Sequence, residues 1–220
     1  MKGRMDKKKL LLGTVVLFVL LGILYFLPLE IPFKKCFPMA LLFLAGFWLQ
    51  SWPIIAAAFF SLAGDVMGDL HQFVPQMGLF AVAHLFYIGY FLSLGLKNKR
   101  NKGPQVKGWW FGVVTAFSVA VFYLASERII PYAPEGVVRT GMYVYAGLIT
   151  VMMWSALMQK DWMWGIGAIL FVFSDSVIAI NKFVSPVPDE RFLIMATYYA
   201  AQLLIFVRAC PAFQPSRSPV

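Results

Sequence analysis

Three ionisable residues lie deep inside long apolar stretches of the sequence and are the strongest candidates for chemistry. They are Asp65, His84 and Asp175. An ionisable side chain at membrane depth costs several kcal/mol, roughly 3 or more, unless it is paired or faces a cavity. Two acids and a histidine in such places can move protons, either in a relay or as an acid and a base. We therefore treat these three residues as functional candidates.

Other polar residues share the segments that carry the two acids. Ser61, Asp65 and Asp69 follow an i, i+4, i+8 spacing, which places them on one face of a helix. Gly64 and Gly68 form a small-xxx-small pair beside this face, which permits close contact with a neighbouring helix. Asp69 is nearer the segment end, where it is expected at a pocket mouth or in solvent.

Further candidates lie on the last two apolar segments. Ser174 directly precedes Asp175, and Lys182 lies two turns further along on a nearby face. Tyr198 and Gln202 form an i, i+4 pair, and both can donate hydrogen bonds to a carboxylate or to a substrate oxygen. An interhelical hydrogen bond is the alternative interpretation of this pair.

The elements that hold these residues are membrane helices. Of the 220 residues, 60% are hydrophobic and 13% are charged, whereas an ordinary globular domain has about 25% charged residues. The net charge of +9 comes mostly from two basic clusters beside apolar spans. Such clusters are topology signals, so we predict an integral membrane protein that does not bind nucleic acid.

Apolar runs of helical length predict an all-α, polytopic membrane helix bundle with eight transmembrane helices. The second run is short for a full crossing, and it could instead join the third with only a kink at Pro53. The predicted spans are 10–27, 37–50, 53–70, 77–96, 108–126, 137–158, 161–180 and 191–209.

The distribution of basic residues favours eight spans over seven. With eight spans and a cytoplasmic N-terminus, 13 of the 19 Lys and Arg residues fall on the cytoplasmic side. Merging the second and third spans would place the two basic clusters on opposite faces. We therefore predict cytoplasmic N- and C-termini in one integral membrane domain, 1–220, of a multi-pass protein in a bacterial plasma membrane. Residues 1–9 would form a basic cytoplasmic tail and 210–220 a flexible tail.

Depth along the predicted spans brings the candidates together. Counted from the outer span ends at about 1.5 Å per residue, Asp65, His84, Asp175 and Tyr198 lie roughly 8 to 10 Å deep. Four polar residues from four spans thus share one layer. This predicts a single outward-facing polar pocket.

Several classes of site are excluded by missing motifs. The sequence has no Gly-x-Ser-x-Gly elbow, no His-Glu-x-x-His and no phosphate loop. Its two histidines, His71 and His84, cannot form a three-histidine zinc site. Cys36 and Cys210 lack the spacing of a metal or haem motif. A mixed His and Asp site stays open, but no motif supports it, and we predict neither a metal nor another cofactor.

Five strings, in this order along the chain, resemble the YhhN family, the multi-pass membrane proteins that include animal lysoplasmalogenases. Two departures are Cys36, where the family usually has proline, and Asp69, where an apolar residue is expected. The matching strings are KCFP (35–38), SLAGD (61–65), AHLFYI (83–88), FSDSVIAINKF (173–183) and YYAAQ (198–202).

The resemblance implies hydrolysis of the vinyl-ether bond of lysoplasmalogens to a fatty aldehyde and a glycerophospho-base. A vinyl ether hydrolyses by protonation of an alkene carbon and capture of the oxocarbenium ion by water, which requires a proton donor and a nearby negative charge. Asp65 and Asp175 are the expected catalytic pair, because burial favours a neutral carboxyl while a hydrogen-bonded partner stays ionised. His84 is expected to orient water or to shuttle a proton.

The expected partners are the lipid bilayer and a lysophospholipid substrate. Its tail would lie between helices and its headgroup would project outward, where Lys182 or Arg191 meets the phosphate. The predicted substrate-binding residues are Ser61, Ser174, Lys182, Tyr198 and Gln202.

Two other functions stay open from the sequence. Buried aspartates also serve as proton relays, so a proton-coupled transporter is one alternative, although no internal repeat is evident. The other is a hydrolase that cleaves an ester or amide bond of another lysolipid, with or without a metal.

Overall fold

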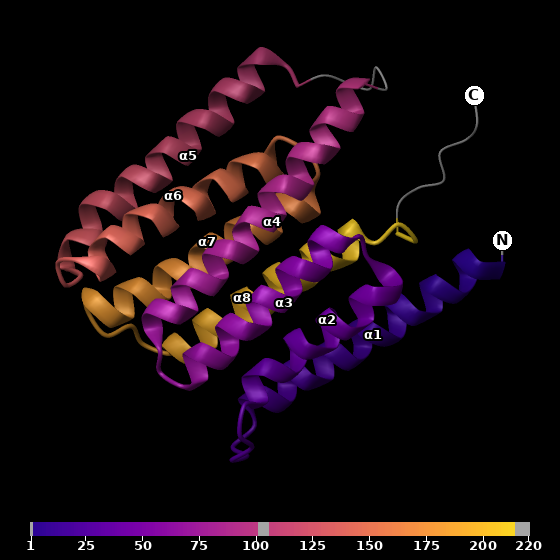
Figure 1. Cartoon of the computed structure of the whole chain (residues 1–220), viewed down its shortest axis with the longest axis horizontal. Helices are drawn as coiled ribbons and strands as arrows, with labels where there is room; N and C mark the ends of the chain where they lie inside the picture. The colour runs from indigo at the N-terminus through magenta and orange to yellow at the C-terminus, as the bar shows by residue number, and fades with distance from the viewer. Residues whose placement is uncertain (1, 101–105, 214–220) are drawn as a thin grey trace.

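The computed structural model describes residues 2–100 and 106–213, and all regular structure within them is helical (Figure 1). Eight α-helices and two 3-10 helices follow one another along this part of the chain. They are α1 (Lys2–Phe26), η1 (Lys34–Cys36), α2 (Phe37–Leu49), α3 (Trp52–Asp69), α4 (Phe73–Arg100), α5 (Gly108–Arg128), η2 (Ile130–Tyr132), α6 (Val137–Leu157), α7 (Trp162–Phe183) and α8 (Glu190–Ala209).

The helices run up and down through a single bundle. The start of α1 and the end of α8 lie at the same end of the bundle (Figure 1). We call the opposite end, where α3, α5 and α7 finish and α4, α6 and α8 begin, the distal end. This arrangement agrees with an even number of helices between the two termini.

The possible merger of the second and third spans is wrong. Gln50 and Ser51 are extended, with φ/ψ of −124/166° and −82/156°, so the chain turns between α2 and α3. The two helices pack against each other, and Ile55 of α3 contacts Gly46 of α2. The chain therefore makes a helical hairpin here and not one kinked helix.

Six of the eight helices in the described residues are long and apolar enough to cross a membrane. The two that fall short are α2 and α3. At about 1.5 Å per residue, the 13 residues of α2 span roughly 20 Å, less than a hydrocarbon core of about 30 Å. The second helix is short, as the length of its apolar run predicts.

The structure describes part of each predicted tail. Residues 2–9 form the first turns of α1, and their cytoplasmic position stays a prediction. At the other end, Cys210 and Ala212 are buried, so the first part of the predicted flexible tail packs on the bundle. The rest of that prediction, residues 214–220, lies outside the described residues.

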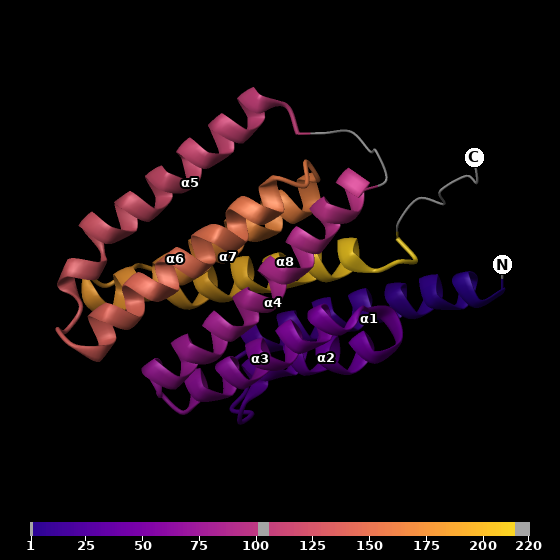
Figure 2. The same cartoon turned by 45° about the horizontal axis from the view of Figure 1, so that its top comes forward.

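The closest packing joins α3 to α4 and α7 to α8, and α6 packs on α4 and α7. Helix α5 packs mainly on α6 and η2 at the edge of the bundle, as both views show (Figures 1 and 2). The four helices that carry the predicted site residues are thus central, and α5 is the most peripheral of the later helices.

An N-cap fixes the start of α7 and thereby the depth of Asp175. The Asp161 carboxylate accepts hydrogen bonds from the backbone N–H groups of Met163 and Trp164, at 3.1 and 3.3 Å. Its second oxygen accepts one from Arg208 Nε of α8 at 2.5 Å. The same carboxylate therefore begins α7 and ties it to the end of α8.

Candidate active site

A polar cavity of about 620 Å³ lies at the distal end of the bundle. Its walls come from the end of α1, from η1, and from α3, α4, α7 and α8. Four carboxylates line it, together with basic residues from three elements. The acids are Asp65, Asp69, Asp175 and Glu190, and the bases include Lys34, Lys35, Lys182 and Arg191.

Asp65 lies in the wall of this cavity and is only 4% exposed. Its carboxylate accepts a hydrogen bond from the Tyr198 hydroxyl of α8 at 2.9 Å. The preceding residue, Gly64, lies against Phe80 of α4, where an added Cβ would come within 2.8 Å of the ring. The small residue that the sequence places beside the acid therefore allows α3 and α4 to approach closely.

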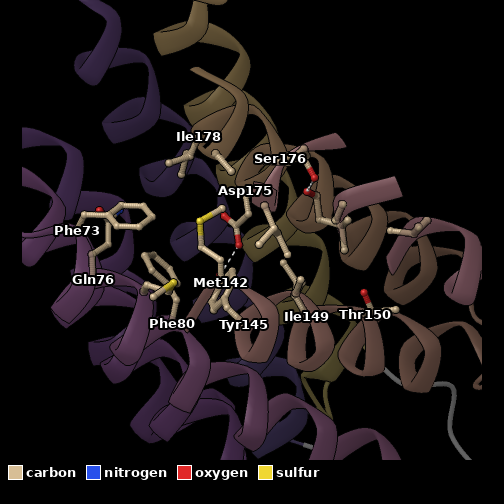
Figure 3. Close-up of a pocket in the computed structure, with 18 residues that line it drawn as sticks. Phe73, Gln76, Phe80, Met142, Tyr145, Ile149, Thr150, Asp175, Ser176 and Ile178 are labelled. Atoms are coloured by element: carbon tan, nitrogen blue, oxygen red, sulfur yellow. Dashed lines mark hydrogen bonds between the residues drawn. The ribbon is translucent and has the colours of Figure 1, made fainter. Parts of the chain in front are cut away.

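Asp175 lies on α7 in the wall of the same cavity and has a different tyrosine partner. The Tyr145 hydroxyl of α6 donates a hydrogen bond to the Asp175 carboxylate, drawn as a dashed line in Figure 3. His84 Nε2 of α4 lies 3.1 Å from the Tyr145 hydroxyl oxygen and 3.8 Å from the Asp175 carboxylate. Three helices thus contribute to a His84–Tyr145–Asp175 chain.

The Tyr145 hydroxyl links His84 to Asp175. When Asp175 is ionised and accepts the one Tyr145 hydroxyl hydrogen, the contact with His84 requires an Nε2–H that donates to the Tyr145 oxygen. His84 is fully buried, and its Nδ1 atom has no hydrogen-bond partner within the described part of the chain. His84 can therefore influence Asp175 through Tyr145, but it does not line the polar cavity.

Ser61 and Gln202 do not line the cavity either. The Gln202 amide donates to the Ser61 hydroxyl at 3.1 Å, and Tyr87 of α4 donates to the Gln202 oxygen at 2.6 Å. All three side chains are buried. The structure therefore places Ser61 and Gln202 in an interhelical hydrogen-bond network, where neither contacts the cavity directly.

The three remaining predicted substrate-binding residues line the cavity: Ser174, Lys182 and Tyr198. The Ser174 hydroxyl donates to the Ile194 carbonyl at 3.0 Å, which joins α7 to α8. Lys182 Nζ lies 5.1 Å from the centre of the Phe73 ring, a cation–π arrangement. Lys182 therefore presents a positive charge at the distal end of the cavity.

Two further cations are held in place at the same end. Arg191 lies over the Tyr25 ring at 4.6 Å and donates to the Tyr25 carbonyl at 2.8 Å. Lys35 Nζ lies 3.1 Å from the Asp69 carboxylate, which is 30% exposed. Asp69 is thus at the cavity wall in an ion pair, apart from the tyrosine-bound acids.

Cys36 stands where the YhhN family usually has proline. It lies at the end of η1 and is buried. Burial, assisted by the nearby charges of Asp65 and Asp69, raises the pKa of its thiol to about 12. The thiol is therefore protonated at neutral pH, and a protonated thiol is a poor nucleophile.

Tyr145 and Tyr87 were not among the predicted site residues. Tyr145 lies eight residues into α6, roughly 12 Å from its distal end, a depth close to that of the four polar residues predicted to share one layer. Tyr143 lies at a similar depth but is 41% exposed. Depth along the sequence therefore does not distinguish the two tyrosines.

The described residues contain no group of three or more His, Cys, Asp and Glu side chains arranged to hold a metal ion. In the cavity, Asp65 and Asp175 have tyrosine partners and Asp69 has a lysine partner. The arrangement can therefore provide hydrogen-bonded carboxyl groups beside a polar cavity.

Comparison with known proteins finds relatives over most of the chain. Residues 29–209 match the YhhN family. Human lysoplasmalogenase TMEM86A is 34% identical over 203 residues, which cover 82% of this chain and 78% of that protein. Its bovine counterpart is 33% identical over 205 residues, with the same coverage of both chains. Human lysoplasmalogenase TMEM86B is 32% identical over 201 residues, covering 84% of this chain and 75% of that protein. No solved structure matches the chain.

Proposed function

Because this chain belongs to the YhhN family, we propose that it is a membrane-embedded lysoplasmalogenase. The reaction is hydrolysis of the vinyl-ether bond of a lysoplasmalogen, which yields a fatty aldehyde and a glycerophospho-base. The relatives carry this activity in their names, and the six apolar helices suit an enzyme whose substrate is a membrane lipid.

The observation that carries a mechanism is the pair of carboxylates in one cavity. Asp65 comes from α3 and Asp175 from α7, and each accepts a hydrogen bond from the hydroxyl of its own tyrosine. Each carboxylate is thus held in position independently. Two carboxyl groups beside one bound lipid can serve as the proton donor and the ionised partner that vinyl-ether hydrolysis needs.

The proposed reaction has three steps. One carboxyl group of the pair transfers its proton to the alkene carbon that is not bonded to oxygen. The oxygen-bearing carbon becomes an oxocarbenium ion, which the other carboxylate stabilises electrostatically. Water adds to that carbon and loses a proton to a carboxylate. The resulting hemiacetal then breaks its original C–O bond, releasing the aldehyde and returning the hydrogen to the departing alcohol oxygen.

The cations at the distal end support placement of the headgroup there. Lys182 and Arg191 line the cavity on the side of the loops, and both can bind a phosphate oxygen. Ser174 and Tyr198 lie deeper in the same cavity. Ser61 and Gln202 act one layer below, where they fix the distance between α3 and α8.

We also propose a membrane topology for the eight helices. All eight helices cross the membrane, α2 and α3 as a hairpin, and both termini are cytoplasmic. The basic residues at the start of α1 and around the end of α4 support this orientation. The polar cavity then faces the outer side.

Hydrolysis of a lysoplasmalogen in D2O tests the reaction and its mechanism together. Purified protein in detergent should release aldehyde that carries one solvent deuterium on the carbon next to the carbonyl, because that carbon receives the proton in the first step. Mass spectrometry of the trapped aldehyde measures the label.

The matched control substrate has a saturated ether chain, which lacks the alkene carbon and should give no product. Two results would contradict the proposal. One is a lack of aldehyde from the vinyl ether, and the other is aldehyde without deuterium. A transporter would instead move substrate across proteoliposomes with no covalent product.

Tyr145→Phe is expected to lower kcat/KM for lysoplasmalogen by roughly 10- to 100-fold, because it removes a hydrogen bond to a carboxylate, worth about 1.5 to 3 kcal/mol. The phenyl ring keeps most of the packing, and His84 loses its link to Asp175. Initial rates of aldehyde release measure the effect.

Tyr143→Phe is the matched control for this substitution. It removes the same hydroxyl from the same helix at a side chain that is 41% exposed and outside the cavity. Its activity should equal that of the unmodified protein. Equal losses from Tyr143→Phe and Tyr145→Phe would show that the hydroxyl of Tyr145 has no particular role.

A further inference from the structure

A second, mainly apolar cavity joins the polar one. It has a volume of about 90 Å³ and is smaller than the polar cavity of 620 Å³. Helices α4, α5, α6 and α7 and the η2 turn all contribute to its walls. We call it the apolar groove. The residues that line both spaces are Phe73, Gln76, Phe80, Asp175 and Ile178.

Hydrocarbon side chains form most of the groove. Figure 3 shows Met142 and Ile149 of α6 facing Asp175 and Ile178 of α7 across it. Ser176 also lines the groove, but its hydroxyl donates to the Val172 carbonyl of its own helix. Away from Asp175, the groove therefore suits an apolar occupant.

Asp175 stands at the junction of the two spaces. Among the described residues, it is the carboxylate that lines both the apolar groove and the polar cavity. Its hydrogen-bond donor, Tyr145, lines the groove, whereas Asp65 lines the polar cavity alone. A molecule with an apolar part and a polar part would pass Asp175 at the boundary between them.

The peripheral helix α5 forms the far wall of the groove. Val121, Ala125 and Ile129 follow an i, i+4, i+8 spacing and face it. On the other side of the groove, Val172 to Ala179 of α7 extend for roughly 10 Å along the helix axis. Helix α5 packs mainly on α6 and η2, so in the proposed topology its remaining faces border the bilayer.

We propose that the apolar groove holds the hydrocarbon chain of the lysolipid, entering from the bilayer, with the bond to be cleaved beside Asp175. The headgroup then lies in the polar cavity. This assignment rests on the proposed lysoplasmalogenase function and deepens it, because it names the residues that select the chain. The positions of these residues predict that α5, α6 and α7 determine which chain lengths the protein accepts.

Ala125→Phe tests the assignment by filling the groove from α5. We expect the ratio of kcat/KM for a long hexadecenyl lysoplasmalogen to that for a short octenyl one to fall at least about tenfold, the effect of displacing two methylene groups from an apolar site. Ala179→Phe, which fills the groove from α7, should shift the ratio in the same direction.

Ala120→Phe is the matched control, because Ala120 lies on the same helix, is exposed, and does not line the groove. Its ratio should stay at the wild-type value. An unchanged ratio in Ala125→Phe and Ala179→Phe proteins that fold would overturn the proposal. So would an equal change in Ala120→Phe.

A photoreactive lysolipid separates this proposal from the proposed function, since labelling needs no turnover. With a diazirine near the end of its chain, the probe should label residues 121–130 and 142–150, located by peptide mass spectrometry. Labelling confined to α1 and α2 would overturn the groove assignment even if vinyl-ether hydrolysis is observed. Labelling of the groove without hydrolysis would support it while contradicting the reaction.

Discussion

Asp175→Asn is expected to lower kcat/KM for lysoplasmalogen about 10³-fold, within the range produced by loss of a positioned acid or base. Asparagine keeps the shape of the side chain, and its amide oxygen can still accept the Tyr145 hydrogen bond. It cannot exchange a proton or carry a negative charge. The loss should therefore appear mainly in the chemical step and in kcat.

Aldehyde release measures this loss, and thermal melting in detergent establishes that the variant folds. Glu135→Gln makes the same carboxylate-to-amide change at a side chain that is 85% exposed and pairs with Arg139 on the surface. Such a pair is worth at most about 1 kcal/mol, and neither residue lines the polar cavity or the apolar groove. Near-wild-type turnover by folded Asp175→Asn protein would remove Asp175 from the catalytic assignment.

The helices were predictable from the sequence because hydropathy and helical length act together. The expected third span, 53–70, differs from α3 by one residue at each end. The expected fourth span, 77–96, ends four residues before α4 does. Lys and Arg are good helix formers, so a helix continues past the point where its apolar run stops. Hydropathy locates the part of a helix that suits lipid, whereas hydrogen bonding decides where the helix ends.

The location of Asp65 and Asp175 beside a polar cavity was also predictable, because a carboxyl group in an apolar span is costly unless it is paired or faces a cavity. Their partners were harder to identify. Tyr198 was found through its i, i+4 relation to Gln202, but the two side chains bind different groups, Asp65 and Ser61. Which way each residue faces depends on the rotation of α8 against α3, and spacing within one helix does not fix that rotation.

The role of Tyr145 was even harder to predict from the sequence. Tyrosine is common near both ends of membrane helices, so its presence in α6 carries little information by itself. Its importance comes from contacts with α4 and α7, which are 61 and 30 residues away in sequence. A polar chain that crosses three helices becomes visible only when their packing is known.

Asp65→Asn is expected to lower kcat/KM by about 10²- to 10³-fold, again through loss of a carboxyl group that takes part in proton transfer or charge stabilisation. The amide can still accept the Tyr198 hydrogen bond, so the α3–α8 contact should survive. Asp69→Asn, one turn further along α3, is the control for Asp65→Asn, because it makes the same carboxylate-to-amide change on the same helix. It breaks a partly exposed ion pair with Lys35, and its activity should fall by less than about fivefold.

The double variant Asp65→Asn/Asp175→Asn distinguishes a catalytic pair from two separate contributions. If the two carboxyl groups act in one chemical step, removing the second after the first should cost little more, so the double variant should be about as slow as the slower single variant. If they act independently, their losses multiply. Steady-state rates of aldehyde release are measured for the unmodified chain, the two single variants and the double variant, which together form a double-mutant cycle. A multiplicative loss would contradict a shared step and leave each aspartate with a role of its own.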